Sequence, residues 1–268
     1  MKPFLKWAGN KYALIERIRQ LLPDAKRLIE PFAGSAAVFL NTHYPSAVLA
    51  DSNGDLIGLY QTLQREGDRF IAYARRLFTA ENNREDAYYI LREEFNRTRH
   101  KRRKAALFLY LNRHGYNGLC RYNAKGGFNV PFGRYTKPYF PEKEMQEFYI
   151  RAQRAEFRVA DFRDVMSAAR AGDVVYCDPP YVPLSRTANF TGYGSAGFGE
   201  MEQKALARLA KSLALRGVTV VISNHDTDFT VYAYRHASLT RFDVQRNISC
   251  NGQNRTKAKE LLALFKAA

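Results

Sequence analysis

The feature that most constrains the fold is a short apolar strand that ends abruptly at two prolines. Residues 174–177 read Val-Val-Tyr-Cys, and Asp178, Pro179, Pro180 and Tyr181 follow directly. Such a run predicts a short buried strand, and proline ends it because proline cannot donate to the hydrogen-bond ladder. The strand tip then offers one carboxylate, proline carbonyls and an aromatic face. A strand end with an ordinary turn is the alternative, but this set suits an amino group on a planar ring, because two oxygens accept its hydrogens while tyrosine stacks on the ring.

A second motif predicts a strand, a tight turn of small residues and the start of a helix. Residues 28–39 read Leu-Ile-Glu-Pro-Phe-Ala-Gly-Ser-Ala-Ala-Val-Phe. Small residues let a ligand approach the backbone, and the N–H groups of a helix start can meet a carboxylate or phosphate. Asp51 ends a second predicted strand roughly 20 residues later, the spacing at which a carboxylate binds ribose hydroxyls. The two motifs together predict a nucleoside cofactor beside an amine-activating site.

The charge of the chain favours a polyanionic partner. Its 268 residues hold 42 Lys and Arg against 26 Asp and Glu, a formal net charge of +16. Residues 95–141 contain eleven Lys or Arg and no acid, with Tyr, Asn, Phe and Gly between them. A solvated surface normally mixes signs, so this stretch predicts a surface that follows a nucleic-acid backbone. A solvated basic face remains the alternative for residues 97–104.

Cysteine, histidine and hydropathy patterns indicate neither a metal site nor a membrane span. Cys120, Cys177 and Cys250 are widely scattered, and the histidines lack metal-ligand spacing. No apolar run reaches the ~18 residues of a membrane span, and the chain does not begin as a secretory signal does. We therefore expect a protein with reduced thiols and no metal, located in the cytoplasm, associated with the nucleoid and monomeric in solution.

The order of the predicted elements indicates an α/β fold with a doubly wound, Rossmann-like sheet and an inserted module. We expect residues 1–53 and 156–268 to form the catalytic domain, and residues 54–155 to form a helical target-recognition domain with a hairpin near 115–136. The expected helices are 55–64, 68–78, 84–96, 103–113, 142–155 and 201–215. The expected later strands are 157–159, 174–177 and 218–222, with a last helix and strand within 257–265.

Taken in order, the motifs resemble those of bacterial DNA adenine methyltransferases of the Dam type. The resemblance runs almost from end to end, through residues 4–11, 30–34, 107–113, 115–123, 128–135, 178–181 and 222–226. It implies methyl transfer from S-adenosylmethionine to adenine N6 in double-stranded DNA, with GATC as the usual site. Because N6 lies inside the duplex, the adenine must be flipped out.

The resemblance also implies the residues of the catalytic and cofactor sites. Asp178 and the Pro179 carbonyl would accept the amine hydrogens, and Tyr181 would stack on the base, with Asp51 on the ribose hydroxyls. Asn10 and Ala36 stand where the family usually has glycine, and we expect Ala36 to crowd the cofactor carboxylate. His225 and Asp226 are expected to shape a pocket wall and not to form a catalytic dyad. The expected catalytic residues are Asp178, Pro179, Pro180 and Tyr181, and the expected cofactor-binding residues are Trp7, Ala8, Gly9, Lys11, Phe32, Ala33, Gly34, Ser35, Asp51, Asp161, Phe162 and Asp178.

For DNA, the resemblance separates residues that read bases from residues that contact phosphates. Arg121 and Lys6 would read guanines, because an arginine or lysine suits the paired acceptors of guanine. Tyr116 and Asn117 would fill the vacated stack. The other expected contacts are Leu119 and Pro131 at a thymine methyl, Tyr135 near the extruded base, and Arg92, Arg113, Asn123, Asn129 and Arg134 at phosphates.

Two other functions fit part of the pattern. The same strand tip suits any exocyclic ring amine, so cytosine N4 or an RNA adenine is a possible target. A DNA-binding protein derived from a methylase but lacking catalysis is a further alternative, against which the intact Asp178 and Asp51 argue.

Overall fold

A seven-stranded sheet organises the protein. The computed structural model describes residues 1–182, 198–245 and 257–268. The strand order is β3-β2-β1-β4-β5-β7-β6, in which the first five strands are parallel and β7 and β6 are antiparallel. The strands are β1 (Arg27–Glu30), β2 (Ser46–Asp51), β3 (Ala155–Val159), β4 (Asp173–Cys177), β5 (Thr219–His225), β6 (Ser238–Gln245) and β7 (Lys257–Phe265). This is the Rossmann-like α/β sheet that the sequence predicts.

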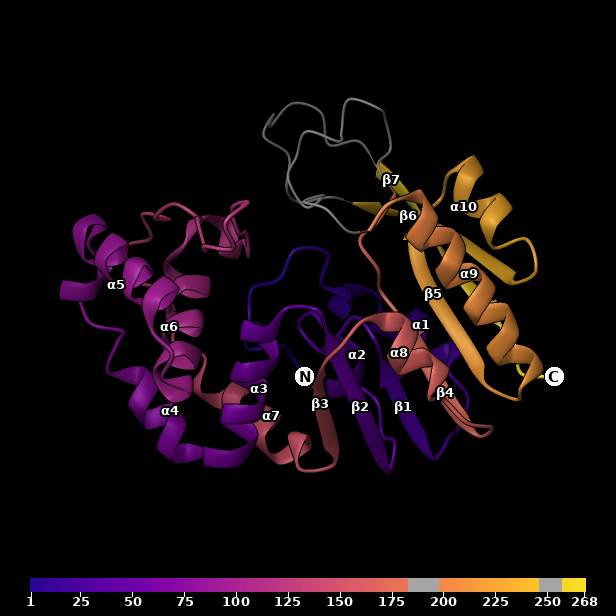
Figure 1. Ribbon diagram of the computed structural model, residues 1–268, viewed down its shortest axis with the longest axis horizontal. Helices are drawn as coiled ribbons and strands as arrows, with labels where there is room; N and C mark the ends of the chain where they lie inside the picture. Colours follow the sequence, from indigo (N-terminus) through magenta and orange to yellow (C-terminus); the bar gives the residue numbers. More distant parts are fainter. Residues whose placement is uncertain (183–197, 246–256) are drawn as a thin grey trace.

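Both faces of the sheet are buried, as the unbroken apolar runs require. Along β4, Val174 and Tyr176 enter one cluster of buried residues, whereas Val175 and Cys177 enter the other. This alternation follows from the two-residue period of a strand. Helices cover both faces: α1 (Ile15–Leu21) and α2 (Ala37–Leu40) contribute to the first cluster, and α8 (Phe162–Ser167) and α9 (Glu200–Leu215) to the second. A further helix, α10 (Asp228–Ala233), lies beside α9 (Figure 1).

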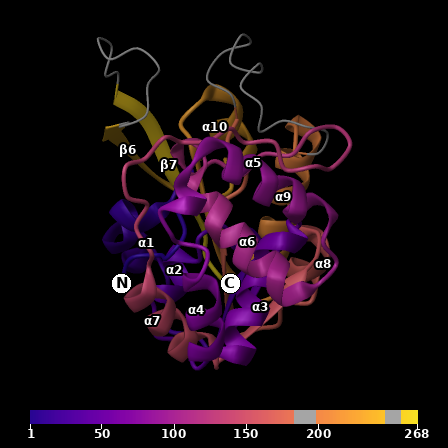
Figure 2. The same ribbon diagram turned by 90° about the vertical axis from the view of Figure 1, so that its left-hand side faces the viewer.

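A helical module lies between β2 and β3 in the chain and extends beyond the β3 edge of the sheet (Figures 1 and 2). Its central helix α6 buries every residue from Ala105 to His114, because neighbouring helices surround it. The buried residues of the module belong to the same cluster as one face of the sheet, so the two parts share a core. The module contains α3 (Gly54–Glu66), α4 (Asp68–Arg75), α5 (Glu85–Arg97), α6 (Lys101–His114) and α7 (Glu142–Ala152).

Three short 3-10 helices complete the described elements: η1 (Lys11–Leu14), η2 (Glu81–Asn83) and η3 (Tyr116–Gly118). The last of them opens residues 115–136, where a hairpin was expected. The segment does fold back on itself, but only two isolated bridges form, Gly115 with Phe132 and Tyr122 with Phe128. A few backbone hydrogen bonds cross the segment, such as Asn129 N–H to the Arg121 carbonyl at 3.0 Å, and side chains add to them: Asn96 pairs with both backbone groups of Phe128, and Asn123 accepts the N–H groups of Lys125 and Gly127.

The C-terminal segment corrects another expectation. Residues 257–265 form one strand, β7, and contain no helix. Their Ala, Leu, Lys and Glu residues favour a helix in isolation, but β7 pairs with both β5 and β6 and buries Leu261, Leu262 and Ala263. Tertiary pairing overrides local propensity at this position. The helix that precedes this strand pair is α10, which the sequence did not reveal.

The order of the strands determines where a ligand can bind. The chain leaves β1 toward β2 and β3 on one side, and later adds β4 and β5 on the other, so the direction reverses between β1 and β4. In open α/β sheets, ligands bind outside the carboxyl ends of the strands at such a reversal. Both sequence motifs, 30–35 and 178–181, begin at these two strand ends.

Candidate active site

Asp178 follows β4 at the reversal point, and two side chains contact the same oxygen of its carboxylate. Lys11 Nζ lies 2.8 Å from Oδ1, and Ser223 Oγ donates to Oδ1 at 2.9 Å. Within the described residues, Oδ2 accepts no hydrogen bond. The carboxylate is thus oriented through one oxygen, and the other is the one that a substrate amine can reach.

Lys11 is in direct contact with Asp178, the expected catalytic residue. It is 6% exposed, donates to the Gly9 carbonyl at 2.5 Å and lies over the Tyr181 ring, 4.6 Å from its centroid. A buried ammonium is tolerated only when it is paired, and Asp178 supplies the pair. The resemblance implies that Lys11 lies near the cofactor, and in the structure its ammonium pairs with Asp178.

A buried polar network holds the backbone that follows Asp178. Gln203 on α9 donates from Nε2 to the Pro180 carbonyl at 2.8 Å. Asn224 donates to Gln203 Oε1 at 3.0 Å and accepts the Val182 N–H at 3.2 Å. Because the Pro180 carbonyl is occupied, the Pro179 carbonyl is the acceptor that remains beside Asp178. Sequence reasoning missed Gln203, which belongs to no motif, and gave no role to Ser223, although Ser223 lies within the 222–226 motif of the resemblance.

Tyr181 is packed at the edge of this tip. Its hydroxyl donates to Glu260 on β7 at 3.4 Å, and its ring meets the His225 ring edge-on at 4.7 Å. Burial, with the charges of Asp178 and Glu260, raises the pKa of the tyrosine hydroxyl, so it stays neutral. Asp226 Oδ1 forms an ion pair with Arg241 Nε at 3.6 Å.

The cofactor-side residues gather at the ends of β1 and β2. Asp51 accepts the N–H of Gly34 at 3.1 Å and the N–H of Asn53 at 2.9 Å. Burial raises the pKa of Asp51, while these two backbone donors oppose the shift. Trp7 packs on the turn so closely that a Cβ at Gly34 would lie 2.9 Å from the indole nitrogen.

Aromatic and small residues complete this side. The Phe32 and Phe162 rings stack with centroids 5.4 Å apart, at the ends of β1 and β3. Ala33 and Ser35 are buried, whereas Ala8 and Gly9 are exposed. Asp161 accepts the Arg163 N–H as the N-cap of α8 and forms an ion pair with the same residue.

The two positions that depart from the family pattern behave differently. Asn10 has φ −49° and caps η1 by accepting the Tyr12 N–H, so its backbone does not require glycine. Ala36 has φ 57° and ψ 30°, a left-handed conformation that strains a residue with a Cβ. Its methyl group is fully buried.

A carboxyl that the sequence did not single out lies beneath this site. Glu30 at the end of β1 is 2% exposed, and its Oε1 has no hydrogen-bond partner among the described residues. Burial, and to a lesser degree the charge of Asp178, raises its pKa to about 8 against an opposing backbone hydrogen bond from Phe39. Glu30 is therefore mainly neutral at pH 7. No sequence signal separates it from an ordinary strand-end acid.

The expected DNA-reading residues meet at the junction of the N-terminal segment and the 115–136 segment. Lys6 Nζ lies over the Tyr135 ring at 4.0 Å, and the Tyr135 hydroxyl accepts the Asn117 N–H at 2.9 Å. Burial and the nearby Arg113 guanidinium lower the pKa of Lys6. Tyr116 is 50% exposed, so its ring is available to a partner.

All five expected phosphate contacts already have protein partners, Asn123 through the N–H groups of Lys125 and Gly127. Asn129 accepts from Arg121 through its side chain at 2.8 Å and its carbonyl at 3.1 Å, which braces the Arg121 guanidinium. Arg92 donates to the Val130 carbonyl, and Arg134 pairs with Glu85. Arg113 is buried and donates to the Phe4 carbonyl at 2.7 Å, so its guanidinium packs in the protein interior. Asn123 is exposed. Of the two residues expected at a thymine methyl, Pro131 is exposed and Leu119 is half-buried.

Comparison with known proteins agrees with this geometry. A model of the D12 class N6 adenine-specific DNA methyltransferases matches residues 7–248. A protein of Serratia marcescens named DNA adenine methylase is 53% identical, over 99% of this chain and 98% of its own length. Proteins of the same name from Escherichia coli (strain K12) and Vibrio cholerae serotype O1 (strain ATCC 39315 / El Tor Inaba N16961) are each 51% identical, covering 99% and 98% of this chain and 95% and 96% of their own.

This chain belongs to the D12 class of N6 adenine-specific DNA methyltransferases. Membership decides between the functions that the sequence left open. The target is adenine in DNA, not cytosine N4 or an RNA adenine, and the protein is an enzyme and not a DNA-binding relative without catalysis. A methyl donor is therefore required.

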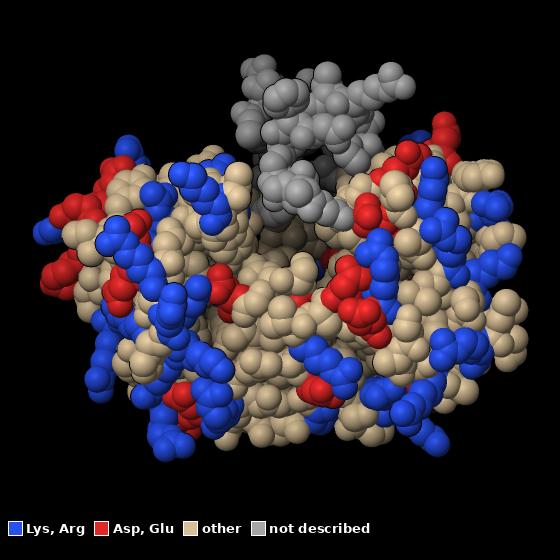
Figure 3. Space-filling model, viewed as in Figure 1, with Lys and Arg blue, Asp and Glu red and all other residues tan. Residues whose placement is uncertain are grey.

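The surface of this D12 methyltransferase is consistent with work on DNA. Lys and Arg side chains spread over the helical module, and the surface is hollowed between the module and the sheet (Figure 3). In the described part of the chain, no group of three or more His, Cys, Asp or Glu residues could hold a metal ion. The helices in that part are too short or too polar to cross a membrane. Cys120 and Cys177 are free thiols, and Cys250 lies outside the described residues.

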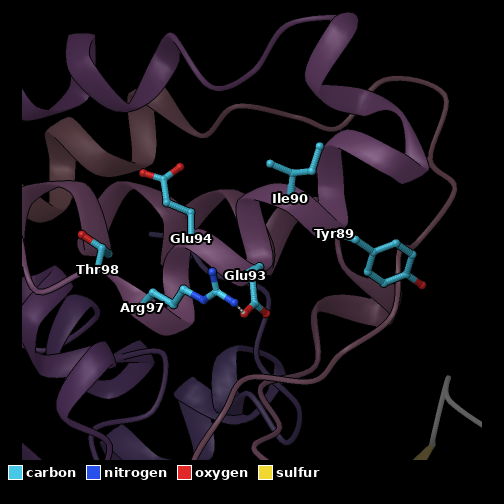
Figure 4. A pocket seen from close by; sticks show the side chains of 6 residues that line it. All are labelled: Tyr89, Ile90, Glu93, Glu94, Arg97 and Thr98. Atoms are coloured by element: carbon cyan, nitrogen blue, oxygen red, sulfur yellow. Dashed lines mark ion pairs between the residues drawn. The ribbon is translucent and has the colours of Figure 1, made fainter.

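A hollow of about 710 Å³ lies apart from the strand ends of the methyltransferase, on the outer side of α5 (Figure 4). Its lining includes Tyr89 and Ile90, while Glu93 and Arg97 at its rim form an ion pair. Its two carboxylates are already paired, Glu93 with Arg97 and Glu94 with Arg103, and neither Asp178 nor Asp51 lines it, so it is not the site that the two motifs form.

Proposed function

We propose that this enzyme transfers a methyl group from S-adenosylmethionine to N6 of an adenine flipped out of duplex DNA, at GATC sites. The observation that carries the proposal is the tip of β4, where Asp178 is held through Oδ1 by Lys11 and Ser223. Among the described residues, Asp178 Oδ2 and the Pro179 carbonyl remain as two acceptors at this strand tip.

Two acceptors solve the main chemical difficulty of the reaction. The lone pair of an adenine amino group is delocalised into the ring, so the nitrogen is a poor nucleophile. When Asp178 Oδ2 and the Pro179 carbonyl accept its two hydrogens, the lone pair turns out of the ring plane. Displacement is then direct: the new N–C bond forms as the S–C bond breaks, and the proton lost from nitrogen passes to Asp178 or to water. Positioning is the principal catalytic contribution.

The residues at the ends of β1, β2 and β3 fit a nucleoside sulfonium cofactor. When bound, S-adenosylmethionine supplies an electrophilic methyl group. Asp51 would accept from the ribose hydroxyls, and the Phe32–Phe162 pair would hold the adenine face. The turn at 33–35 would hold the carboxylate. Trp7, fixed on Gly34, would present its ring to the sulfonium.

Lys11 has a role on the catalytic carboxylate and not only near the cofactor. Its ammonium forms an ion pair with Asp178 inside the protein. The contact with Oδ1 also fixes the direction in which Oδ2 points. Lys11 is thus a positioning residue for Asp178.

For recognition, we propose that the duplex lies across the hollow between module and sheet. Arg121, braced by Asn129, would read a guanine, and Lys6 would read the first guanine of the site. Tyr116 and Asn117 would occupy the space that the flipped adenine leaves. We further infer that the enzyme acts as a monomer, in the cytoplasm and on the nucleoid.

The decisive experiment is expression in a bacterial host that lacks GATC methylation, followed by methylation-resolving sequencing of its DNA. We expect N6-methyladenine at GATC in cells with the wild-type chain and none with Asp178→Ala. Methylation at another adenine site would contradict the GATC assignment alone. Methylation that persists in Asp178→Ala would contradict the role of the β4 tip.

A further inference from the structure

One buried amide joins the two segments that carry the proposed DNA contacts. Asn112 lies near the end of α6 and is 2% exposed. Its Oδ1 accepts the Lys6 N–H at 2.9 Å, and its Nδ2 donates to the Lys6 carbonyl at 2.7 Å and to the Gly118 carbonyl at 3.3 Å. A single side chain therefore satisfies both backbone polar groups of residue 6 and one of the 116–118 turn.

The surrounding contacts form a closed circuit. Gly118 has φ 63°, and a Cβ there would lie 2.3 Å from Lys6 Cβ, so the turn and residue 6 approach as closely as glycine allows. The Lys6 ammonium lies over the Tyr135 ring, and the Tyr135 hydroxyl accepts the N–H of Asn117 in the turn. Asn112 closes the circuit from inside the protein.

Residues on either side of this circuit have anchors of their own. Trp7 packs on Gly34, and Lys11 pairs with Asp178. Loss of the Asn112 amide would therefore release Lys6 and the turn while the cofactor side and the catalytic carboxylate stay in place.

We propose that Asn112 is a positioning residue for base discrimination, which holds Lys6 and the 116–118 turn as one rigid unit against the DNA. The proposal rests on the proposed function and adds the residue that sets the geometry of reading. An apolar side chain of similar size would fill the space but leave three backbone groups without partners. The amide is thus needed for its hydrogen bonds and not for its volume.

The test compares Asn112→Ala with Leu107→Ala, which truncates another fully buried side chain of α6. Single-turnover methyl transfer is measured on a duplex with the preferred site and on duplexes in which its first base pair is changed. We expect the ratio of the two rates to fall about tenfold in Asn112→Ala, as for a lost base contact, and to stay unchanged in Leu107→Ala. An unchanged ratio in Asn112→Ala, or an equal fall in both variants, would overturn the proposal.

Two further measurements separate positioning from general destabilisation. Because Asn112 acts through Lys6, adding Asn112→Ala to Lys6→Ala should lower the ratio no further, and an additive loss would contradict the mechanism. Trp7 is the only tryptophan, so its fluorescence reports cofactor binding. We expect the cofactor affinity of Asn112→Ala to match the wild type, and a loss in step with discrimination would count against positioning.

Two outcomes need separate treatment. Should the alanine variant fail to fold, Asn112→Ser, which retains a hydroxyl, is expected to lower the same ratio. A wild-type enzyme without base preference would overturn the proposed function and this inference together. A wild-type preference that Asn112 variants leave intact would overturn the inference alone.

Discussion

At the scale of the residue, Lys11 holds its ammonium group inside the protein against the carboxylate of Asp178. Removal of Asp178 would therefore leave a buried charge unpaired in addition to removing an amine acceptor. We predict that Asp178→Ala abolishes methyl transfer and lowers the free energy of unfolding by about 3–5 kcal/mol. Urea unfolding and methyl-transfer assays would measure the two effects separately.

A second substitution tests this explanation. Lys11→Met in the Asp178→Ala background removes the unpaired charge, so we expect stability to recover in part while activity stays absent. If the double variant is no more stable than Asp178→Ala, the ion pair is not what holds Lys11 in place.

Glu30 supplies a prediction on pH. Its pKa of about 8 lies above the usual value of 4.5, so between these values the folded protein binds more protons than the unfolded chain. Stability contributed by the neutral carboxyl is full below about pH 4.5 and is lost as the pH rises through 8. We predict that the free energy of unfolding of the wild type falls by a few kcal/mol relative to that of Glu30→Gln across that window. Urea unfolding at a series of fixed pH values would measure it.

The control for Glu30 is an exposed acid. Glu16 on α1 is 80% exposed, so Glu16→Gln makes the same chemical change at a site that is not buried. A flat difference between wild type and Glu30→Gln would show that Glu30 is ionised in the folded protein at neutral pH.

At the scale of the element, residues 115–136, which we propose read the DNA, are held by a few backbone hydrogen bonds and by side chains instead of a regular ladder. Asn129 braces Arg121, so both residues should affect reading. We predict that Arg121→Ala costs about 1–3 kcal/mol against the correct site and relaxes discrimination at one base pair. Asn129→Ala should relax discrimination at the same base pair to a smaller degree. Competition binding with every single-base alternative would measure both effects. If Asn129→Ala instead weakens binding to all sequences alike, its contact is with phosphate.

At the scale of the whole molecule, the formal net charge of +16 draws DNA toward the enzyme, and exposed arginines convert that attraction into contacts. Arg134 pairs with Glu85 on α5 and is 78% exposed, so its guanidinium can leave Glu85 and contact a phosphate. We predict that Arg134→Gln weakens binding to all sequences and lowers the slope of log affinity against log salt by about one.

Arg65 offers a matched control. It also pairs with a glutamate and is exposed, but it lies at the end of α3 farthest from the strand tips. Arg65→Gln removes the same charge from the molecule, so an equal loss of slope would assign the Arg134 effect to net charge and not to a contact.

The sequence alone determined the elements whose signal is local. The runs at 28–30 and 174–177 are apolar because both faces of a parallel sheet are buried, and their ends bear the glycine turn and the Asp-Pro-Pro-Tyr motif. Parallel strands place their carboxyl ends at one edge of the sheet, so the two motifs lie close together regardless of the length and path of the connecting segments. The basic stretch at 95–141 could also be found from the sequence alone, because it is defined by the charges of consecutive residues.

Only the tertiary structure decided which partner each polar group has. Lys11 lies on Asp178, Asn112 joins Lys6 to Gly118, Arg113 turns inward, and residues 257–265 pair as a strand despite helical propensity. Burial determines these outcomes, because a group removed from water must find its partner among whatever residues surround it. Those residues are far away in the chain, so no local pattern could have identified them.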